Sequence, residues 1–411
     1  MGNKNRFGIG ALSLITALCA ALCLGWSLKN LHPNSGILLS NEKRGRADIT
    51  AVLNSFAAAN EQVDPTPEPE PGETPGHTED PIPTETPEPG RPHYVIAEGS
   101  LPPPPREACY GAVQIGEAAS VLGVIERARE YGLLEEGEET VFDPGLNFYS
   151  RSDIQYYLDE TILTICWKEV IEGKVCSFAE VKIADASQFR RKLAGDSFGS
   201  PYQYFASELA VSSNAVVAMN ADYYAFRDFG IVVYDRALYR FKTAPLNSRF
   251  KKYNCIDNLF INGDGDFIFF PRGTEIEQED LERYLADNDI RFSLAFGPIL
   301  VKEGVVQEYD WYTLGEVNIS YSRAGIGQVG RLHYLSMCVN HASGAHELWT
   351  VNEFAVHFGQ KGVWNAYCLD GGQTSEIVFR GVPYNHVDYG AERLVSDIIY
   401  FASALPEEVF P

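Results

Sequence analysis

The most informative segment of the chain, residues 363–385, reads VWNAYCLDGGQTSEIVFRGVPYN. A short apolar strand is predicted from Trp364 to Leu369, and it stops abruptly at Asp370-Gly371-Gly372. The polar run Gln373 to Glu376 separates it from the next apolar residues. Two glycines allow a backbone to approach a ligand closely, and a carboxylate beside hydroxyl groups can act as a base or a nucleophile. A plain Asp-Gly hairpin turn is the alternative, but it needs only two loop residues. The loop is therefore a candidate active site.

Upstream of this segment, the sequence predicts one well-marked helix. Thr350 occupies the N-cap position, Glu353 follows three residues later, and Gly362 lies just past the end. This pattern is a capping box at the start of a helix and a glycine cap at its end. A second helix is predicted over residues 117–131, where apolar residues recur at helix spacing.

Paired strands account for much of the remaining chain. Alternating apolar residues interrupted by turn residues predict hairpins at residues 161–183 around Glu172-Gly173, 257–271 around residues 262–265, 294–306 around residues 302–304, and 326–339 around Gly330. The many Tyr and Phe residues of these segments also favour strands. We expect an α+β fold, with mixed β-sheets rich in hairpins and flanking helices, in a single large domain.

The first hundred residues differ in composition from the rest. Residues 1–6 carry Lys4 and Arg6, and residues 7–28 carry no charge, which predicts a transmembrane signal anchor with a cytoplasmic N-terminus. A cleaved signal peptide is the alternative. The Pro, Thr and Glu repeats that follow cannot bury apolar area, so they predict a disordered spacer. We expect a single-pass protein of the cell membrane with a cytoplasmic stub (1–6), an anchor (7–28), a spacer (29–106), a helical extension (107–160) and an extracytoplasmic domain (161–405).

Charge and cysteine spacing exclude several function classes. The net charge of −23 argues against nucleic acid as a partner, because binding to a phosphate backbone needs clustered Lys and Arg. No cysteine pair has zinc-ligand spacing, and we expect neither a metal nor another cofactor. A two-residue turn at Glu172-Gly173 would place Cys166 opposite Ala179 rather than Cys176. We therefore predict mostly buried, reduced cysteines, with disulfides as the alternative in an oxidising compartment.

Three further segments end or begin strands with polar residues. AVVAMNADYYAF (215–226) leaves a buried strand at Asn220 and Asp222, FGPILVKEGVV (296–306) begins with Gly297, and SYSRAGIGQVGRLHYLSM (320–337) carries Arg323 before a hairpin. A guanidinium at such a place can bind a phosphate in a bidentate manner. The structural alternatives are a turn that satisfies its own backbone, an ordinary hairpin, and a surface arginine.

Together these segments resemble the phosphodiester glycosidase family. The family's Asn-Gly-Asp-Tyr-Phe run corresponds to Asn220 to Tyr224, and its Gly-Pro-x-Leu-Val run with a following Gly corresponds to Gly297 to Gly304. Its Arg-x-x-Ile-Gly run corresponds to Arg323 to Gly327, and its Leu-Asp-Gly-Gly-Gly-Ser-Ser run corresponds to Leu369 to Ser375. Its closing Asn corresponds to Asn385, and its Glu-Arg-x-Val-Ser-Asp run corresponds to Glu392 to Asp397. The resemblance extends over residues 160–402. Departures at Ala221, Gln373, Thr374 and residues 339–341 affect the expected substrate, but they leave Asp370 in place.

The resemblance implies hydrolysis of the bond between the anomeric carbon of a sugar and a phosphodiester. A phosphate monoester leaves more readily than an alcohol, so the reaction needs little help from a general acid. The candidate catalytic residues are Asp370 and Asp222, with Glu376 as a reserve acid. The candidate substrate-binding residues are Asn220, Arg323, Gly297, Gly371, Gly372, Thr374, Ser375, Asn385 and Arg393. The expected partner is a carbohydrate or sugar phosphate, such as a cell-wall polymer.

Two alternatives remain open at this point. The chain could be a non-catalytic protein of the cell envelope that binds polysaccharide or takes part in exopolysaccharide assembly. Asp222, Asp370 and nearby carbonyl groups could also bind a divalent cation through oxygen ligands. Two carboxylates favour an enzyme, because a binding module does not need a pair of them.

Overall fold

The computed structural model describes residues 93–222, 224–246, 255–314, 317–341 and 348–407. They belong to one compact unit, Glu85–Pro411. The predicted stub, the predicted anchor and the spacer up to residue 92 lie outside the described residues. No helix in the described ranges has both the length and the apolar character needed to cross a membrane.

A nine-stranded antiparallel sheet forms the centre of the unit. Its strand order is β14-β13-β17-β15-β16-β5-β4-β3-β2. The strands are β2 (Tyr110–Val113), β3 (Ile154–Leu158), β4 (Ile162–Ile171), β5 (Lys174–Ile183), β13 (Ile299–Lys302), β14 (Val305–Val306), β15 (Arg323–Gly330), β16 (His333–Val339) and β17 (Asn365–Leu369).

A second, five-stranded antiparallel sheet packs against the first and has the order β19-β18-β7-β20-β6. Its strands are β6 (Phe189–Leu193), β7 (Val217–Asn220), β18 (Ile377–Phe379), β19 (Val382–Pro383) and β20 (Asp397–Phe401). Smaller sheets join β10 (Asn258–Ile261) to β11 (Phe267–Phe270) and β12 (Phe292–Leu294), β8 (Gly230–Tyr234) to β9 (Ala237–Lys242), and β1 (Tyr94–Val95) to β21 (Leu405–Pro406).

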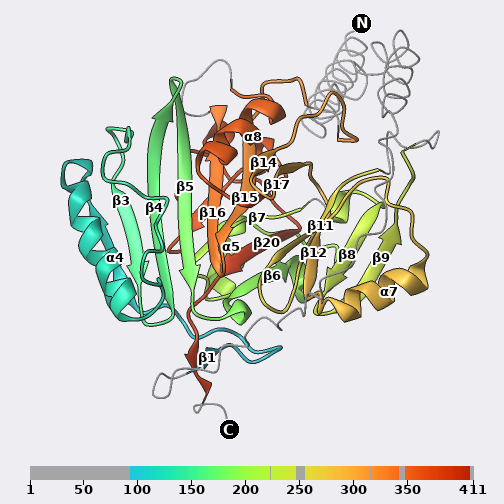
Figure 1. Cartoon of the computed structure of the whole chain (residues 1–411), viewed down its shortest axis with the longest axis horizontal. Helices are drawn as coiled ribbons and strands as arrows, with labels where there is room; N and C mark the ends of the chain where they lie inside the picture. Colours follow the sequence, from blue (N-terminus) through green and yellow to red (C-terminus); the bar gives the residue numbers. More distant parts are fainter. Residues whose placement is uncertain (1–92, 223, 247–254, 315–316, 342–347, 408–411) are drawn as a thin grey trace, which may run out of the picture. The chain divides into compact units, whose positions relative to one another are not determined.

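The described α-helices are short and lie outside the sheets. They are α4 (Val121–Glu130), α5 (Ala206–Ser212), α7 (Gln278–Asp287) and α8 (Val351–Gln360). Figure 1 shows α4 beside β3 and α8 against β15 and β17. The predicted α+β class with hairpins and flanking helices is confirmed, but the sheets of the described residues are antiparallel rather than mixed.

The predicted hairpins form, and the one register predicted from the sequence is confirmed. In the β4–β5 hairpin, Cys166 pairs with Ala179, as the turn at Glu172-Gly173 requires. Both turn residues have a positive φ, 50° for Glu172 and 77° for Gly173, which suits a tight two-residue connection between twisted strands. Cys166 and Cys176 are fully buried, and burial raises the pKa of both thiols.

Strict alternation along the long strands produces two cores. On one face of the nine-stranded sheet, Trp167 and Phe178 stack with ring centroids 5.2 Å apart and pack toward the helices. On the other face, Cys166 and Ala179 pack with Ile377 of the five-stranded sheet. Because side chains alternate between faces, one strand supplies both layers.

Helix α8 begins and ends where the sequence predicts. The hydroxyl of Thr350 accepts a hydrogen bond from the Glu353 amide, and the Glu353 carboxylate accepts one from the Thr350 amide, which is a capping box. The helix packs closely on β15 because that strand has Gly325 and Gly327 on the facing side. A Cβ at Gly325 would lie 2.9 Å from the Phe358 ring. The Gly-x-Gly run therefore makes room for a helix.

The N-terminal part of the unit contains structure that composition does not reveal. Tyr94–Val95, within the predicted spacer, pairs with β21. The next residue, Ile96, is buried, and its amide donates to Ser187 Oγ at 2.8 Å. The predicted helical extension 107–160 contains α4, but it also supplies β2 and β3 to the central sheet. The flank is rich in proline and the strands are short, so the sequence shows no periodic pattern from which these pairings could be predicted.

Candidate functional site

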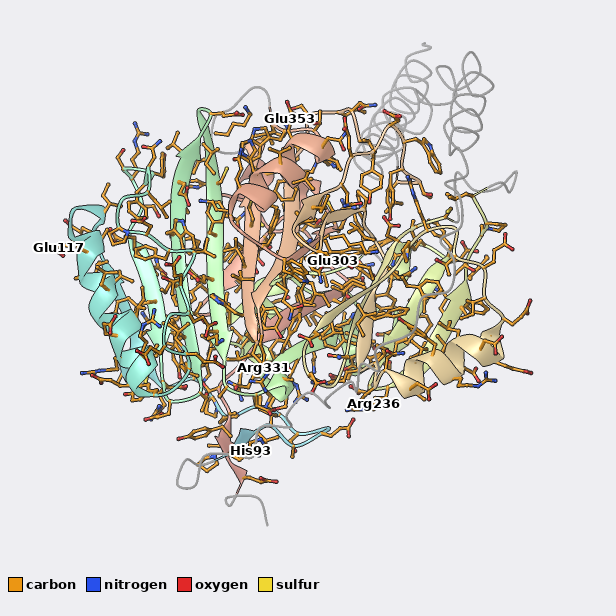
Figure 2. All side chains as sticks on the ribbon, viewed as in Figure 1. His93, Glu117, Arg236, Glu303, Arg331 and Glu353 are labelled. Carbon is orange, nitrogen blue, oxygen red and sulfur yellow. The ribbon has the colours of Figure 1, made fainter. Side chains whose placement is uncertain are left out.

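Several strands of both sheets end at one edge, where polar residues gather. In the central sheet Ala324 pairs with Leu369, so the start of β15 lies beside the end of β17. In the second sheet Asn220, the last residue of β7, pairs with Ile398 of β20. We call residues 220–222, 321–323, 340–341, 370–376 and 385–392 the polar rim. Figure 2 labels Arg331, which lies in the β15–β16 turn at the opposite end of that hairpin from the rim.

Asp370 is a half-buried carboxylate of this rim, and two groups of its own loop hold it in place. Its Oδ1 accepts the Gly371 amide at 3.0 Å, and its Oδ2 accepts the Thr374 hydroxyl at 2.8 Å. Its amide donates to Ala221 O at 3.2 Å, which ties the loop to the residue before Asp222. The carboxylate is thus oriented by short local contacts.

The two glycines allow the loop to pass close to the neighbouring strand. A Cβ at Gly371 would lie 2.7 Å from the carbonyl oxygen of Ser322. Gly372 has a φ of 72°, and its amide donates to the same oxygen at 2.9 Å. A residue with a side chain would be strained at both positions.

Arg323 is the first residue of β15 and is buried. The ladder between β15 and β17 ends at Ala324 and Leu369, so Arg323 and Asp370 are the two residues just beyond its last pair. The Arg323 Nη2 donates to Ile319 O at 2.8 Å, and the guanidinium lies 5.8 Å from the centre of the Tyr321 ring.

Two buried asparagines support the loop from behind. The Asn220 side chain donates to Asp370 O at 2.7 Å and accepts the Glu376 amide at 3.0 Å, so it connects the two ends of the loop. The Asn385 side chain accepts the Ile377 amide at 2.7 Å and donates to Ser375 O at 2.9 Å. Both side chains hold the backbone rather than face a ligand.

Asp222 lies in a buried network of charges. Its side chain is fully buried, and its Oδ2 lies 3.3 Å from Arg191 Nη2 and 3.1 Å from Arg227 Nη2. The same oxygen accepts the Ala295 amide at 2.9 Å. Arg191 also donates from Nε to Asp397 Oδ2 at 2.8 Å. Because all of these contacts are with buried protein groups, Asp222 holds the rim in position.

Asp397 shares Arg191 with Asp222. Burial raises the pKa of Asp397, the attraction of Arg191 lowers it, and the negative charge of Asp222 raises it further. Burial opposes the charge on Arg191, but the two carboxylates outweigh it and raise the guanidinium pKa. The pairing of two carboxylates with Arg191 and Arg227 offsets the cost of burying these charges.

Glu376 is a fully buried carboxyl group that lies close to the Glu392 carboxylate. Burial and the nearby negative charge of Glu392 raise its pKa to about 9, so it is protonated at neutral pH. Glu392 itself accepts the Ser207 amide at 3.0 Å and the Ser207 hydroxyl at 2.7 Å. Glu376 is therefore a buried, neutral acid of the rim.

The remaining predicted residues have different surroundings. Gly297 is buried, and a Cβ there would lie 2.2 Å from the Tyr312 hydroxyl, so it serves packing. The Ser375 hydroxyl is buried and has no hydrogen-bond partner in the described ranges. Arg393 is half-buried next to Glu392, and among the described residues no hydrogen bond or ion pair joins it to the Asp370 loop.

An open pocket of about 700 Å³ lies along the segment 383–392. Its wall is tied to the Asp370 loop, since the Gln373 side chain donates to Ala391 O at 3.0 Å. The Ser322 hydroxyl donates to Asp388 Oδ2 at 2.6 Å and fixes the same segment to the start of β15. No group of three or more His, Cys, Asp or Glu residues that could hold a metal ion occurs in the part of the chain that the structure describes.

Sequence reasoning missed the arginines of the network and the pocket residue Tyr389. Arg191 occupies an inward position of β6 between Phe189 and Leu193, and both of these are fully buried. An arginine in phase with buried residues of a strand is a usable signal of an internal ion pair. Tyr389 carries no comparable signal, because its exposure and backbone conformation depend on the folded loop.

A comparison with protein-family models returns one family, described as phosphodiester glycosidase, over residues 213–402. These residues match the phosphodiester glycosidase family. The resemblance predicted from the motifs is thereby confirmed, and all five motifs lie inside the matched range. The asparagine supports and the Asp370 loop described above belong to this part of the chain.

Relatives of the phosphodiester glycosidase-like chain are distant. A curated relative, the SPbeta prophage-derived uncharacterized protein YomE of Bacillus subtilis (strain 168), is 26% identical over 211 residues, which are 49% of this chain and 30% of that protein. The catalytic domain of zebrafish N-acetylglucosamine-1-phosphodiester alpha-N-acetylglucosaminidase, auto-inhibited by its pro-peptide, is 15% identical with a TM-score of 0.45 and covers 59% of this chain and 83% of that one. A hypothetical protein from Synechocystis is 14% identical with a TM-score of 0.41 and covers 59% and 62%.

Proposed function

We propose that this protein hydrolyses the bond between the anomeric carbon of a sugar and a phosphodiester, in a cell-envelope glycan or glycoconjugate. The observation that carries the proposal is that Asp370 and Arg323 lie just beyond the last pair of the β15–β17 ladder, at the polar rim. A carboxylate beside a guanidinium suits a substrate with an electrophilic carbon and an adjacent anionic phosphate. The family match over residues 213–402 supports this class of reaction.

In the proposed reaction, the bond between the anomeric carbon and the phosphate oxygen breaks, and the oxygen of water takes its place on carbon. Asp370 attacks the carbon or removes a proton from the water, while Arg323 binds the phosphate that leaves as a monoester. Thr374 holds Asp370 through its hydroxyl, and Asn220 holds the loop backbone. Asp222 and its arginines act from behind as positioning residues.

The non-catalytic alternative gains support from one observation. Of the three candidate carboxylates, Asp222 and Glu376 have fully buried side chains, so only Asp370 is placed to reach a ligand. A polysaccharide-binding or exopolysaccharide-assembly protein of the cell envelope needs only one such group. An activity assay therefore separates the two functions.

We also propose that the protein acts outside the cytoplasmic membrane, where its N-terminal segment would anchor it. The uncharged residues 7–28, preceded by Lys4 and Arg6, support this location. A carbohydrate polymer of the envelope would then be within reach of the catalytic unit. Protease treatment of intact cells that fails to release residues 93–411 would contradict this location.

The test of the catalytic function is turnover of N-acetylglucosamine 1-(methyl phosphate) by the full-length protein. The products expected are free N-acetylglucosamine and methyl phosphate. Asp370→Asn should lower kcat by about a thousandfold or more, because it removes the group that acts on carbon or water. The matched control is Asp264→Asn, in the exposed turn between β10 and β11, which should retain full activity. Activity that persists in Asp370→Asn would exclude Asp370 as the catalytic residue.

A further inference from the structure

A buried histidine at the start of β16 lies between two carboxylates. His333 is 1% exposed, and its Nε2 is 2.7 Å from Glu180 Oε1 of β5. Its Nδ1 is 3.3 Å from Glu138 Oε1, in the loop that follows α4. Lys182 of β5 also binds Glu138 Oε1, at 2.5 Å, and it donates to Arg331 O at 2.9 Å. A protonated His333 therefore completes a cluster of two cations and two anions.

This cluster fastens the loop beyond α4 to the central sheet. We call residues 135–142, with the sequence EEGEETVF, the strap. Glu180 accepts the Val141 amide at 2.7 Å and the Phe142 amide at 2.9 Å. The strap has four glutamates, and Glu138 is the one among them that is not exposed. Because these glutamates repel one another, the strap depends on positive charge that the sheet supplies.

The charged groups around His333 come from three elements. Glu180 and Lys182 belong to β5, where Lys182 pairs directly with His333 across the ladder. Glu138 belongs to the strap, and Arg129 of α4 donates from Nη2 to Glu138 O at 2.6 Å. The cluster lies at the turn end of the β15–β16 hairpin, opposite the polar rim. An inference about it therefore does not depend on the proposed function.

The two contacts of the His333 ring require its charged form. Burial lowers the pKa of His333, but the hydrogen bonds with Glu138 and Glu180 outweigh burial and raise this pKa above its ordinary value. Burial raises the pKa of Glu138, but the bonds from His333 and Lys182 outweigh it and lower that pKa to about 2. An imidazolium has two N–H groups, one for each carboxylate. A neutral imidazole has one, and it turns a lone pair toward the other carboxylate.

We propose that His333 is a pH-sensitive fastener, whose protonated ring binds Glu138 and Glu180 together and whose neutral ring releases the strap from the sheet. Loss of the proton leaves one carboxylate facing a lone pair in a buried place, and such a contact is costly. The folded-state pKa lies above the unfolded value of 6.5. The stabilisation of the strap is therefore fully present below about pH 6.5, and it is lost as the pH rises through the folded-state pKa.

The experiment is hydrogen exchange of the full-length protein between pH 6 and pH 9, followed by mass spectrometry of the peptides that cover the strap. Exchange rates are divided by the intrinsic rate at each pH, which gives protection factors. In the wild type, the protection of the strap should fall about tenfold for each unit of pH above the folded-state pKa of His333. His333→Gln cannot carry a charge, so its strap should already exchange fast at pH 6 and should lack this fall.

Two further variants show whether the proton of His333 is responsible. Glu138→Gln removes one of the two carboxylates that hold the proton, so the fall in protection should begin at a lower pH than in the wild type. His93→Gln is the matched control, because His93 also lies between two carboxylates, 2.9 Å from Glu407 and 3.5 Å from Asp185, but beside β1 and exposed. Its strap should behave as in the wild type.

Two results would overturn the proposal. One is a wild-type strap whose protection is constant from pH 6 to pH 9, because His333 would then hold no proton that matters to the strap. The other is a fall of the same size and at the same pH in His333→Gln, which would assign the titration to another group. A purely structural role of Glu138 would weaken the strap of Glu138→Gln equally at every pH and would leave the pH of the fall unchanged, which also contradicts the proposal.

Discussion

At the scale of single residues, the rim separates groups that hold the loop from groups that face outward. Asn220 and Asn385 use their side-chain amides on the backbone of residues 370–377. Asp222 is enclosed by two arginines. Asp370 differs from these residues, because its carboxylate is half-buried and accepts hydrogen bonds from Gly371 and Thr374 of its own loop. Asp370 is therefore the carboxylate on which the proposed chemistry depends.

Glu376 leads to a prediction about pH and stability. Its pKa rises from 4.5 to about 9 on folding, so the native state keeps a proton that the unfolded state releases above pH 4.5. The free energy of unfolding should therefore fall as the pH rises from about 5 toward 9. At pH 7 it should be about 3 kcal/mol lower than it would be if residue 376 stayed neutral in both states. Glu376→Gln is always neutral, so its melting temperature should exceed that of the wild type increasingly between pH 5 and pH 8. Calorimetry at several pH values measures the difference.

The control for this titration is Glu117→Gln, an exposed glutamate outside the rim. Its melting temperature should follow that of the wild type at every pH. A difference between Glu376→Gln and the wild type that stays constant from pH 5 to pH 8 would mean that Glu376 is not protonated in the native state.

At the scale of elements, helix α8 packs closely against strand β15 because glycines of β15 face the helix. A methyl group at Gly325 would lie 2.9 Å from the Phe358 ring and 3.1 Å from Phe354 and from the Tyr367 carbonyl oxygen. Gly325→Ala should therefore overpack this contact and destabilise the fold by about 1–3 kcal/mol, measured by denaturant unfolding. Gly330→Ala is the matched control on the same strand, because a Cβ there meets nothing within 4 Å. Equal stabilities of the two variants would show that the helix can move aside.

At the scale of the whole molecule, the described unit begins near residue 93. Removal of residues 1–92 should leave a fragment that unfolds cooperatively, since β1 still pairs with β21 and Ile96 remains buried. Removal of residues 1–97 should cost about 2–3 kcal/mol more, because it deletes the strand pairing and the burial of Ile96. Urea unfolding of the two fragments measures the difference. Indistinguishable midpoints would place the true boundary after residue 97.

The chain itself determined most of the local structure and the position of the candidate site. The turn at Glu172-Gly173 set the register of β4 and β5, and Thr350 with Glu353 set the start of α8, because hairpin turns and helix caps depend on residues close in sequence. The abrupt polar break after Leu369 located the loop that carries Asp370.

Tertiary structure alone decided which polar residues support the loop and which face outward. Asp222 and Asp370 follow strands of different sheets in the same way in the sequence, yet one is enclosed by Arg191 and Arg227 while the other is half-buried at the rim. Their surroundings come from residues that lie far away along the chain, and local pattern does not encode such contacts. The charge of Glu376 and the exposure of Tyr389 depend on the same long-range packing.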